Sequence, residues 1–437
     1  MSLMSFMRNK ISLQKILILK ISLFFFPLIL SAQTEQAYYQ NKLNTYFSKD
    51  HEVKNFVKVE ENRILLYASE KGMAGGRAEV ILSWAEVDSL RNIISTLPEK
   101  ELEKLLIEKR DSVIYYIKKD SLKHTTTTSL KGMKIAIDPG HIGGQYDMGQ
   151  VESRCMCLNI DSAHQLKLEE GNLTFFTAQI LKKKLEAQGA IVMLSRPDTG
   201  LSALGITYYE WKKKIKNRAY IDSLVKEGLL NEKEVALLHG HLADKAIFSE
   251  VFGSMDMAVR ARRINAFHPD MTVIIHYNVN EKNTGWTKTT DKDFVMAFVG
   301  GCVISKDLKT QAGRLNLLRL LISNDIENSV KLSSYTVNHL SADLKVPIAK
   351  RSDATYLSEK CLSTPAAGVY SRDLALTRMI KGPLVYGEPL YQDNNKECTL
   401  LSGYCDKIAG DTSASRISMV ADAYYKAIED YVVGLQK

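Results

Sequence analysis

The stretch that decides the fold is MKIAIDPGH, residues 133–141. Its apolar residues form a short run, interrupted by one lysine, that is typical of a strand buried on both faces. The Pro-Gly pair ends this strand, and His141 follows at once. A second buried strand is predicted over residues 271–275, and it too is followed directly by a histidine, His276. Each predicted strand therefore carries an imidazole at its carboxyl end.

Helices and strands alternate on both sides of these two strands. Apolar residues spaced three or four apart predict helices over residues 173–188 and 257–267. Shorter apolar runs predict further strands over residues 190–194 and 384–386. This alternation predicts an α/β fold whose central sheet is mostly parallel or mixed and is flanked by helices.

Two segments fall outside this alternation. Residues 34–130 mix predicted helices with strand-like stretches between 55 and 68. We expect a separate, small α+β region of unknown role there, ending in a threonine-rich linker at 124–128. Residues 200–256 are rich in Lys, Glu, Leu and Tyr, and they predict a helical insertion within the α/β part.

The first 33 residues have the pattern of a cleaved signal peptide: four Lys or Arg, an apolar run over 21–30, and small residues at the cleavage point. The apolar run is short for a membrane span, so a retained anchor is the less favoured alternative. Without this segment the formal net charge falls from +8 to +4, which is too low to indicate a nucleic-acid-binding protein. We expect a periplasmic or secreted protein with no stable membrane span in its mature form.

Cysteines and a histidine pair suggest two further metal sites, which we disfavour. Six cysteines in an exported chain permit disulfides. Cys155 and Cys157 are one residue too close for the usual zinc ribbon, so disulfide pairing or simple burial is favoured. His239 and His241 lie in the polar insertion, where a surface pair is the favoured interpretation.

The residues at the strand ends suggest a metal-dependent hydrolase. In open α/β sheets, sites form at the carboxyl ends of the strands, so His141 and His276 could bind one metal ion. Glu170, just before the helix 173–188, is placed to be a third ligand, and Glu388 follows the last strand as a candidate general base. The alternative is that each residue is structural: a hydrogen-bonded histidine, or an acid stabilised by a helix dipole.

At these residues the sequence resembles the zinc-dependent N-acetylmuramoyl-L-alanine amidases called amidase type 3. The resemblance covers roughly residues 131–435 and rests on motifs in the family's order. They are DPGHIGG at 138–144; Glu170 before a helix, then GAIVMLSR at 189–196; Arg260 with Asn265, Asp270 and IIHYN at 274–278; and PLVYGE at 383–388 with Asn394. Three features depart from the family's pattern: Ile142, the enlarged loop before Glu170, and the pair Tyr386-Gly387.

The resemblance implies roles for individual residues. One Zn²⁺ would be bound by His141, Glu170 and His276, with Glu388 as the catalytic carboxylate. Glu169 is the competing ligand if the register is one residue out. Two further residues are expected to contact substrate, although a structural ion pair would account for the first of them equally well: Arg372 and Asn278.

The implied reaction is hydrolysis of the amide bond between N-acetylmuramic acid and L-alanine in peptidoglycan. A zinc peptidase acting on stem peptides is the alternative within enzymes, since the same site could serve it. A catalytically silent wall-binding module is the alternative from another class, but it would more often have lost a ligand. Because a wall hydrolase endangers its own cell, one expectation is that the insertion 200–256 restricts access to the site or binds a protein regulator. An insertion packed away from the site, with no such role, is the equally favoured alternative.

Overall fold

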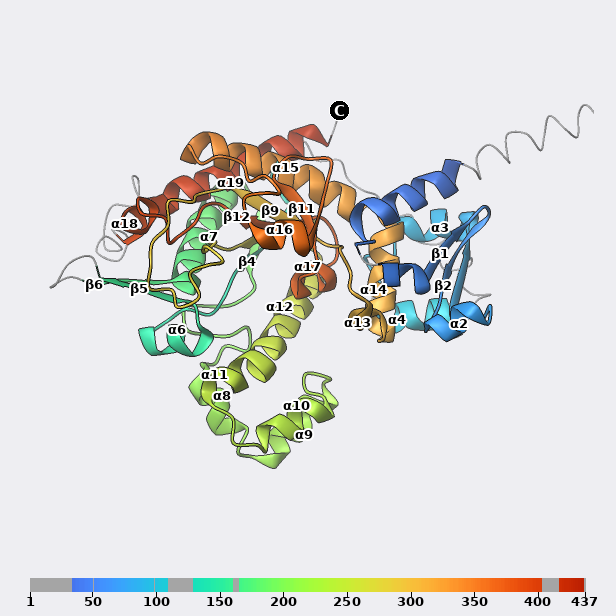
Figure 1. Cartoon of the computed structure of the whole chain (residues 1–437), viewed down its shortest axis with the longest axis horizontal. Coiled ribbons are helices and arrows are strands. Elements are labelled where there is room, and N and C mark those ends of the chain that lie inside the picture. Colours follow the sequence, from blue (N-terminus) through green and yellow to red (C-terminus); the bar gives the residue numbers. More distant parts are fainter. Residues whose placement is uncertain are drawn as a thin grey trace, which may run out of the picture. The chain divides into compact units, whose positions relative to one another are not determined.

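The structure is a computed structural model that describes residues 34–49, 51–97, 99–108, 129–159, 165–402 and 416–435. The predicted signal peptide and the threonine-rich linker lie outside these residues. The chain forms two compact units (Figure 1). The first combines residues up to 121 with Ile304–Ile322, and the second combines Leu122–Val303 with Ser323–Lys437.

The first unit is a small α+β assembly. A helix over residues 34–46 precedes an antiparallel sheet in the order β1 (Val57–Glu60), β2 (Arg63–Leu66), β3 (Val80–Ser83). Its other elements are η1 (His51–Asn55), α2 (Glu70–Ala74), α3 (Trp84–Arg91), α4 (Glu99–Glu103) and η2 (Lys104–Glu108). Ser83 begins α3 with a capping box to Glu86, which fixes where the strand ends and the helix starts.

Two helices of the first unit come from a distant part of the chain: α13 (Ser305–Leu308) and α14 (Gln311–Ile322). Every residue of α14 from Leu317 to Ile322 is buried, including the charged Arg319, so this end of the helix is enclosed on all sides. Arg314 forms a nearly buried ion pair with Glu79, with Nε and Nη2 donating at 2.6 and 2.8 Å. The first unit therefore includes Ile304–Ile322, a segment that lies within the range 131–435 expected from the sequence to form the α/β part.

Breaking this ion pair should destabilise the first unit. Arg314→Ala leaves the Glu79 carboxylate largely buried without its partner, so we expect the free energy of unfolding to fall by roughly 3 kcal/mol. Lys58→Ala is the control, because Lys58 is exposed and pairs with Glu60 on the surface of the same unit. Urea unfolding followed by Trp84 fluorescence measures both, and equal losses in the two variants would contradict the structural role of the pair.

The second unit contains a seven-stranded mixed sheet. The strand order is β10 (Cys361–Ser363), β11 (Val369–Arg372), β9 (Met296–Val299), β12 (Leu384–Glu388), β8 (Met271–Ile275), β4 (Lys134–Pro139), β7 (Ile191–Leu194). The last four strands in this order are mutually parallel, whereas β9 and β11 run the other way. The predicted α/β class with a mixed central sheet is confirmed.

Helices cover both faces of this sheet (Figure 1). On one side α7 (Glu170–Ala187), α15 (Asp325–Leu344) and α19 (Arg416–Gly434) pack against the strands and against one another. On the other side α12 (Gly253–Phe267) and α17 (Ala375–Met379) bury the small side chain of Ala136 and the apolar side chain of Ile274. None of the described helices is both long and apolar enough to cross a lipid bilayer.

The remaining elements are short and lie at the edges of the sheet. Before α7, the chain forms a helix and a two-stranded hairpin: α6 (Tyr146–Glu152), β5 (Cys155–Asn159) and β6 (Gln165–Glu169). Two further short helices of the second unit are α16 (Thr355–Glu359) and α18 (Glu397–Ser402).

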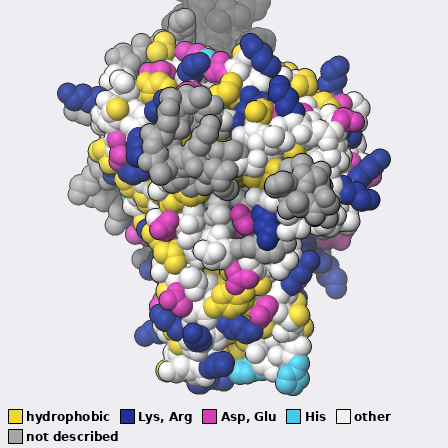
Figure 2. All heavy atoms as spheres, turned by 90° about the vertical axis from the view of Figure 1, so that its left-hand side faces the viewer, with side chains coloured by type: hydrophobic (Ala, Val, Ile, Leu, Met, Phe, Trp, Pro, Cys, Tyr) yellow, Lys and Arg dark blue, Asp and Glu magenta, His cyan; other side chains and the backbone are white. Residues whose placement is uncertain are grey.

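The predicted insertion is helical, as expected, with α8 (Tyr208–Lys214), α9 (Arg218–Lys226), α10 (Glu232–Leu238), α11 (Asp244–Ile247) and the π-helix η4 (Phe248–Phe252). These helices enclose an aromatic core around Tyr208, Trp211 and Phe252. Ile142, next to His141, packs into the same core. The outer surface of the insertion, at the lower end of Figure 2, mixes Lys and Arg with Asp and Glu side chains. The insertion is therefore packed onto the loop that follows β4, and the face seen in Figure 2 carries both charges.

Candidate functional site

The predicted chemical groups meet at one edge of the sheet. The strands β4, β8 and β12 are neighbours and parallel, so their carboxyl ends lie together. His141 follows the first strand, His276 follows the second, and Glu388 is the last residue of the third. Glu170 is the first residue of α7 and approaches the same edge from the hairpin β5–β6.

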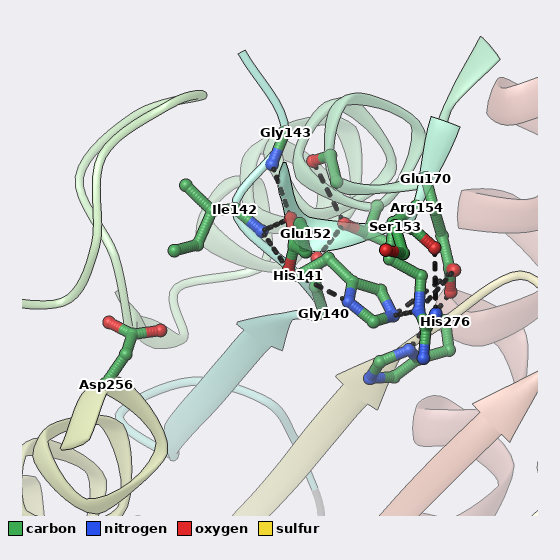
Figure 3. A network of polar contacts seen from close by, with 12 residues as sticks. Gly140, His141, Ile142, Gly143, Glu152, Ser153, Arg154, Glu170, Asp256 and His276 are labelled. Atoms are coloured by element: carbon green, nitrogen blue, oxygen red, sulfur yellow. Dashed lines mark hydrogen bonds and ion pairs between the residues drawn. The ribbon is translucent and has the colours of Figure 1, made fainter. Parts of the chain in front are cut away.

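His141, Glu170 and His276 form a compact cluster (Figure 3). One oxygen of Glu170 lies 3.2 Å from His141 Nε2, and the other lies 3.1 Å from His276 Nδ1. One potential ligand atom from each residue lies within 4.8 Å of the other two. Two ligands of one tetrahedral zinc ion would be separated by about 3.3 Å, given usual bond lengths near 2.0 Å. The donor set and its spacing therefore fit a small divalent cation.

The loop that carries His141 is held in an unusual conformation. His141 has a φ of +59°, which is uncommon for a residue other than glycine. Gly140 is required for a different reason, because a Cβ at this position would lie 2.4 Å from the His276 ring. Strained positions of this kind persist only where the surrounding structure enforces them.

Two buried arginines enforce this loop conformation. Arg260, in α12, donates to the carbonyl oxygens of Pro139 and His141, each at 2.7 Å. Arg196, after β7, donates to the carbonyl oxygens of Pro139 at 3.2 Å and Gly171 at 2.7 Å. Through these two bonds Arg196 links the His141 loop to the start of α7, where Glu170 lies. Both arginines belong to the motifs found in the sequence, and their place in the structure is a supporting one.

Glu152, at the end of α6, is a functional residue that the sequence analysis missed. Its carboxylate lies 3.0 Å from His141 Nδ1 and accepts hydrogen bonds from the backbone N–H groups of Ile142 and Gly143. Burial lowers the pKa of His141, but the Glu170 and Glu152 carboxylates outweigh that effect and raise it to about 9. The enlarged loop was noticed in the sequence, yet nothing in its pattern distinguishes Glu152 from other acids. Glu152 orients His141 with Nε2 toward Glu170.

Arg154 was missed as well. Its Nε donates to His141 Nε2 at 3.2 Å and lies 3.8 Å from Glu170 Oε2. The guanidinium also lies over the ring of Trp286, at 5.4 Å from the centroid. A metal ion bound by the cluster would need the lone pair of His141 Nε2, so it would replace both a proton on that nitrogen and the contact with Arg154. Metal binding therefore requires the Arg154 side chain to withdraw.

Glu388 is buried beside the cluster. Its Oε2 has no hydrogen-bond partner among the described residues, although buried carboxylate oxygens are normally paired. Burial, together with the negative charge of Glu170, raises the pKa of Glu388 to about 8. A carboxyl group with this pKa can exchange a proton near neutral pH, as a general acid or base requires.

The two predicted substrate-binding residues lie near Glu388 but are engaged with protein groups. The Arg372 guanidinium lies against the adjacent rings of Phe298 and Tyr356, at 4.9 Å from each centroid, and its charge lowers the pKa of Glu388. Asn278 Nδ2 donates to the Tyr356 hydroxyl at 2.9 Å. Neither side chain lies in the cluster itself.

The competing residues of the sequence analysis lie outside the cluster. Glu169 accepts a hydrogen bond from Asn172 at 3.4 Å, and Glu170 is the acid that faces the histidines. His239 and His241 are exposed. Cys155, Cys157 and Cys398 form no disulfide, Cys302 and Cys361 are buried, and Cys405 lies outside the described residues.

A cavity of about 300 Å³ opens beside the cluster. His141, His276 and Arg154 line it on the side of the sheet edge. The insertion and the start of α12 contribute Phe248, Ser249, Gly253 and Met257, and the segment at α17 contributes Leu374 and Leu376. A substrate that reaches the cluster through this cavity meets mostly apolar walls.

The sequence matches a family model described as N-acetylmuramoyl-L-alanine amidase over residues 135–415. The chain belongs to this family. The resemblance seen in the sequence is thereby confirmed, and the activity of this enzyme is that of a peptidoglycan amidase. No curated protein matches this amidase significantly.

Solved structures similar to this amidase have low sequence identity. The CwlD amidase from Clostridioides difficile in complex with the GerS lipoprotein is 17% identical, with 69% of this chain and 98% of that chain covered and a TM-score of 0.37. The catalytic domain of CwlV from Bacillus (Paenibacillus) polymyxa var. colistinus is 12% identical, with 68% and 97% covered and a TM-score of 0.33.

The contact between Glu152 and His141 leads to a prediction for metal affinity. Glu152→Gln keeps the shape of the side chain but removes the charge beside Nδ1, so Zn²⁺ affinity should fall by about 10- to 100-fold. Glu169→Gln is the matched control, because it changes a neighbouring acid of the same loop that turns away from the cluster. Chelator competition measures both affinities. Equal affinities in the two variants would show that Glu152 does not support the metal site.

Proposed function

We propose that this amidase holds one zinc ion through His141, Glu170 and His276 and uses it to cut the bond between N-acetylmuramic acid and L-alanine. The observation that carries the proposal is the convergence of three ligand atoms within 4.8 Å beside a cavity. Two imidazoles and a carboxylate are a usual ligand set for catalytic zinc, which keeps a fourth position for water or substrate. Bound zinc supplies a Lewis acid that polarises the scissile carbonyl and lowers the pKa of water.

Glu388 then transfers the protons of the reaction. As a carboxylate it accepts a proton from the attacking water, and as an acid it donates that proton to the departing nitrogen of L-alanine. Oε2 of Glu388 has no hydrogen-bond partner among the described residues, so it is the atom that can receive the proton. A cation bound at the cluster would lower the pKa of Glu388 from about 8 and increase the fraction of carboxylate at neutral pH.

The substrate-binding roles of Arg372 and Asn278 are part of the proposal. Arg372 packs against two adjacent aromatic rings close to Glu388, where its charge can attract a carboxylate of the stem peptide. Asn278 holds the Tyr356 hydroxyl and so supports one of those rings. Export by the leader at residues 1–33 and action outside the cytoplasmic membrane complete the proposal, since peptidoglycan lies there.

Three substitutions test the site. His141→Ala and His276→Ala each remove a ligand and should release most of the zinc. Glu388→Gln keeps the side-chain volume but accepts no proton, so zinc should stay bound while turnover falls by about 10² or more. Elemental analysis gives the zinc content. Mass spectrometry of digested peptidoglycan gives the bond cut, and stem peptides with a free L-alanine amino group are expected. Cuts within the stem peptide alone would support a peptidase instead.

We further propose that the insertion restricts access to the site. Its last part, from Phe248 to Gly253, forms one wall of the cavity. Asp256 joins the insertion to the metal loop, because it accepts hydrogen bonds from the backbone of Ala203 and from Arg260, which holds His141. A protein regulator that bound the insertion could therefore act on the cluster through Arg260.

A bulky side chain at the cavity wall tests this role. Ser249→Trp should narrow the cavity and lower kcat/KM on whole peptidoglycan severalfold, because Ser249 is exposed and lines the cavity. Ser223→Trp places the same side chain on the exposed face of α9 and should leave activity unchanged. Unchanged activity in a folded, zinc-loaded Ser249→Trp variant would contradict control of access by the insertion.

A further inference from the structure

Tyr386 occupies a position where this chain departs from its family. The residue lies in β12, two positions before Glu388. Side chains two apart in a strand project from the same face of the sheet, so Tyr386 and Glu388 face the same side.

The Tyr386 ring packs directly on one of the candidate metal ligands. It stacks on the His276 imidazole with centroids 4.4 Å apart and an angle of 8° between the planes. Tyr386 also lines the cavity beside the cluster, together with His141 and Arg154. The ring is therefore fixed in the space that a substrate amide must enter to reach His141 and His276.

Among the described residues no hydrogen-bond partner is found for the Tyr386 hydroxyl, nor for the buried hydroxyl of Tyr424, whereas Tyr277 and Tyr370 of the same unit are paired. Tyr277 contacts the Thr177 hydroxyl at 2.7 Å, and Tyr370 donates to the Ala349 carbonyl at 2.9 Å. The charged groups that act on the Tyr386 hydroxyl are those of the site: Glu388, Glu170, Arg372 and Arg154. An unpaired phenol among these groups is placed to bind a substrate atom.

We infer that Tyr386 is a catalytic residue whose hydroxyl donates a hydrogen bond to the carbonyl oxygen of the scissile amide as that oxygen becomes an oxyanion. The inference rests on the proposed function, because it needs an amide carbonyl positioned at the cluster. The proton stays on the tyrosine throughout, so the step adds a hydrogen bond and moves no proton. A phenol is a hydrogen-bond donor at neutral pH.

The competing explanation is that the ring only supports His276. Tyr386→Phe separates the two, because it keeps the stacked ring and removes the hydroxyl alone. If Tyr386 donates to the oxyanion, kcat on a muramoyl tripeptide should fall by about 10². KM should change little, and the zinc content should equal that of the wild type. If the ring only supports His276 and has no catalytic role, kcat should be unchanged in Tyr386→Phe.

Binding of a transition-state mimic provides a second measurement. A muramoyl-alanine phosphinate places a charged tetrahedral centre where the amide carbonyl would lie, so Tyr386→Phe should weaken its binding by about the factor lost in kcat. Substrate binding is measured in Glu388→Gln, which turns over slowly. The muramoyl tripeptide should bind equally well to this variant and to the double variant that also carries Tyr386→Phe. Tyr370→Phe is the control, since it removes a tyrosine hydroxyl from β11, which is separated from β12 by β9, and Tyr370 does not line the cavity.

The possible results distinguish failure of the proposed function from failure of the proposed role of Tyr386. Failure of the wild-type enzyme to release L-alanine-terminated peptides would reject the proposed function and, with it, the role of Tyr386. Normal wild-type turnover together with undiminished turnover and phosphinate binding in Tyr386→Phe would reject the role of Tyr386 alone. A lower kcat with weaker phosphinate binding, at full zinc content, supports it.

Discussion

The site depends on the hydrogen bonds that Arg260 makes to the backbone around His141. His141 adopts a left-handed backbone conformation that the chain would not keep by itself, because the cost for a residue with a side chain is of the order of 1–3 kcal/mol. Arg260 offsets this cost by pairing with the Pro139 and His141 carbonyl oxygens in the interior. Asp256 in turn fixes the guanidinium of Arg260 at 2.7 Å. A buried ion pair thus sets the direction in which the first imidazole points.

Around this fixed loop, the charged groups of the cluster shift one another's pKa values in directions that favour binding of a cation. Glu170 keeps a pKa well below the ordinary value because the two histidines outweigh the effect of burial. Its negative charge then helps to keep Glu388 protonated near neutral pH. The pKa of His276 is lowered, chiefly by burial, so that this imidazole keeps a lone pair to offer. One carboxylate is therefore ready to bind a metal ion while the other holds a proton that it can exchange.

Local patterns in the sequence were sufficient for part of this structure. The strands before His141 and His276 are buried on both faces, and such strands read as continuous apolar runs, so they were predicted from the sequence alone. The spacing also placed Glu170 at the start of a helix, which the structure bears out. By contrast, the strands β9, β10 and β11 were not predicted, because each comprises only three or four residues, too few for a clear period. Glu152 and Arg154 could not be found either, since their function depends on how the enlarged loop folds back onto His141. Contacts of this kind depend on long-range packing and leave no periodic signal.

The origin of α14 has a consequence for how the chain folds. The core of the first unit needs residues from both ends of a stretch of more than two hundred residues, as the pairing of Glu79 with Arg314 shows. Closing so long a loop costs conformational entropy, and contacts of high sequence separation form slowly. During synthesis from the N-terminus, the small sheet is complete long before the helix that covers its core exists. The first unit is thus made first but can finish folding only after most of the chain has been made.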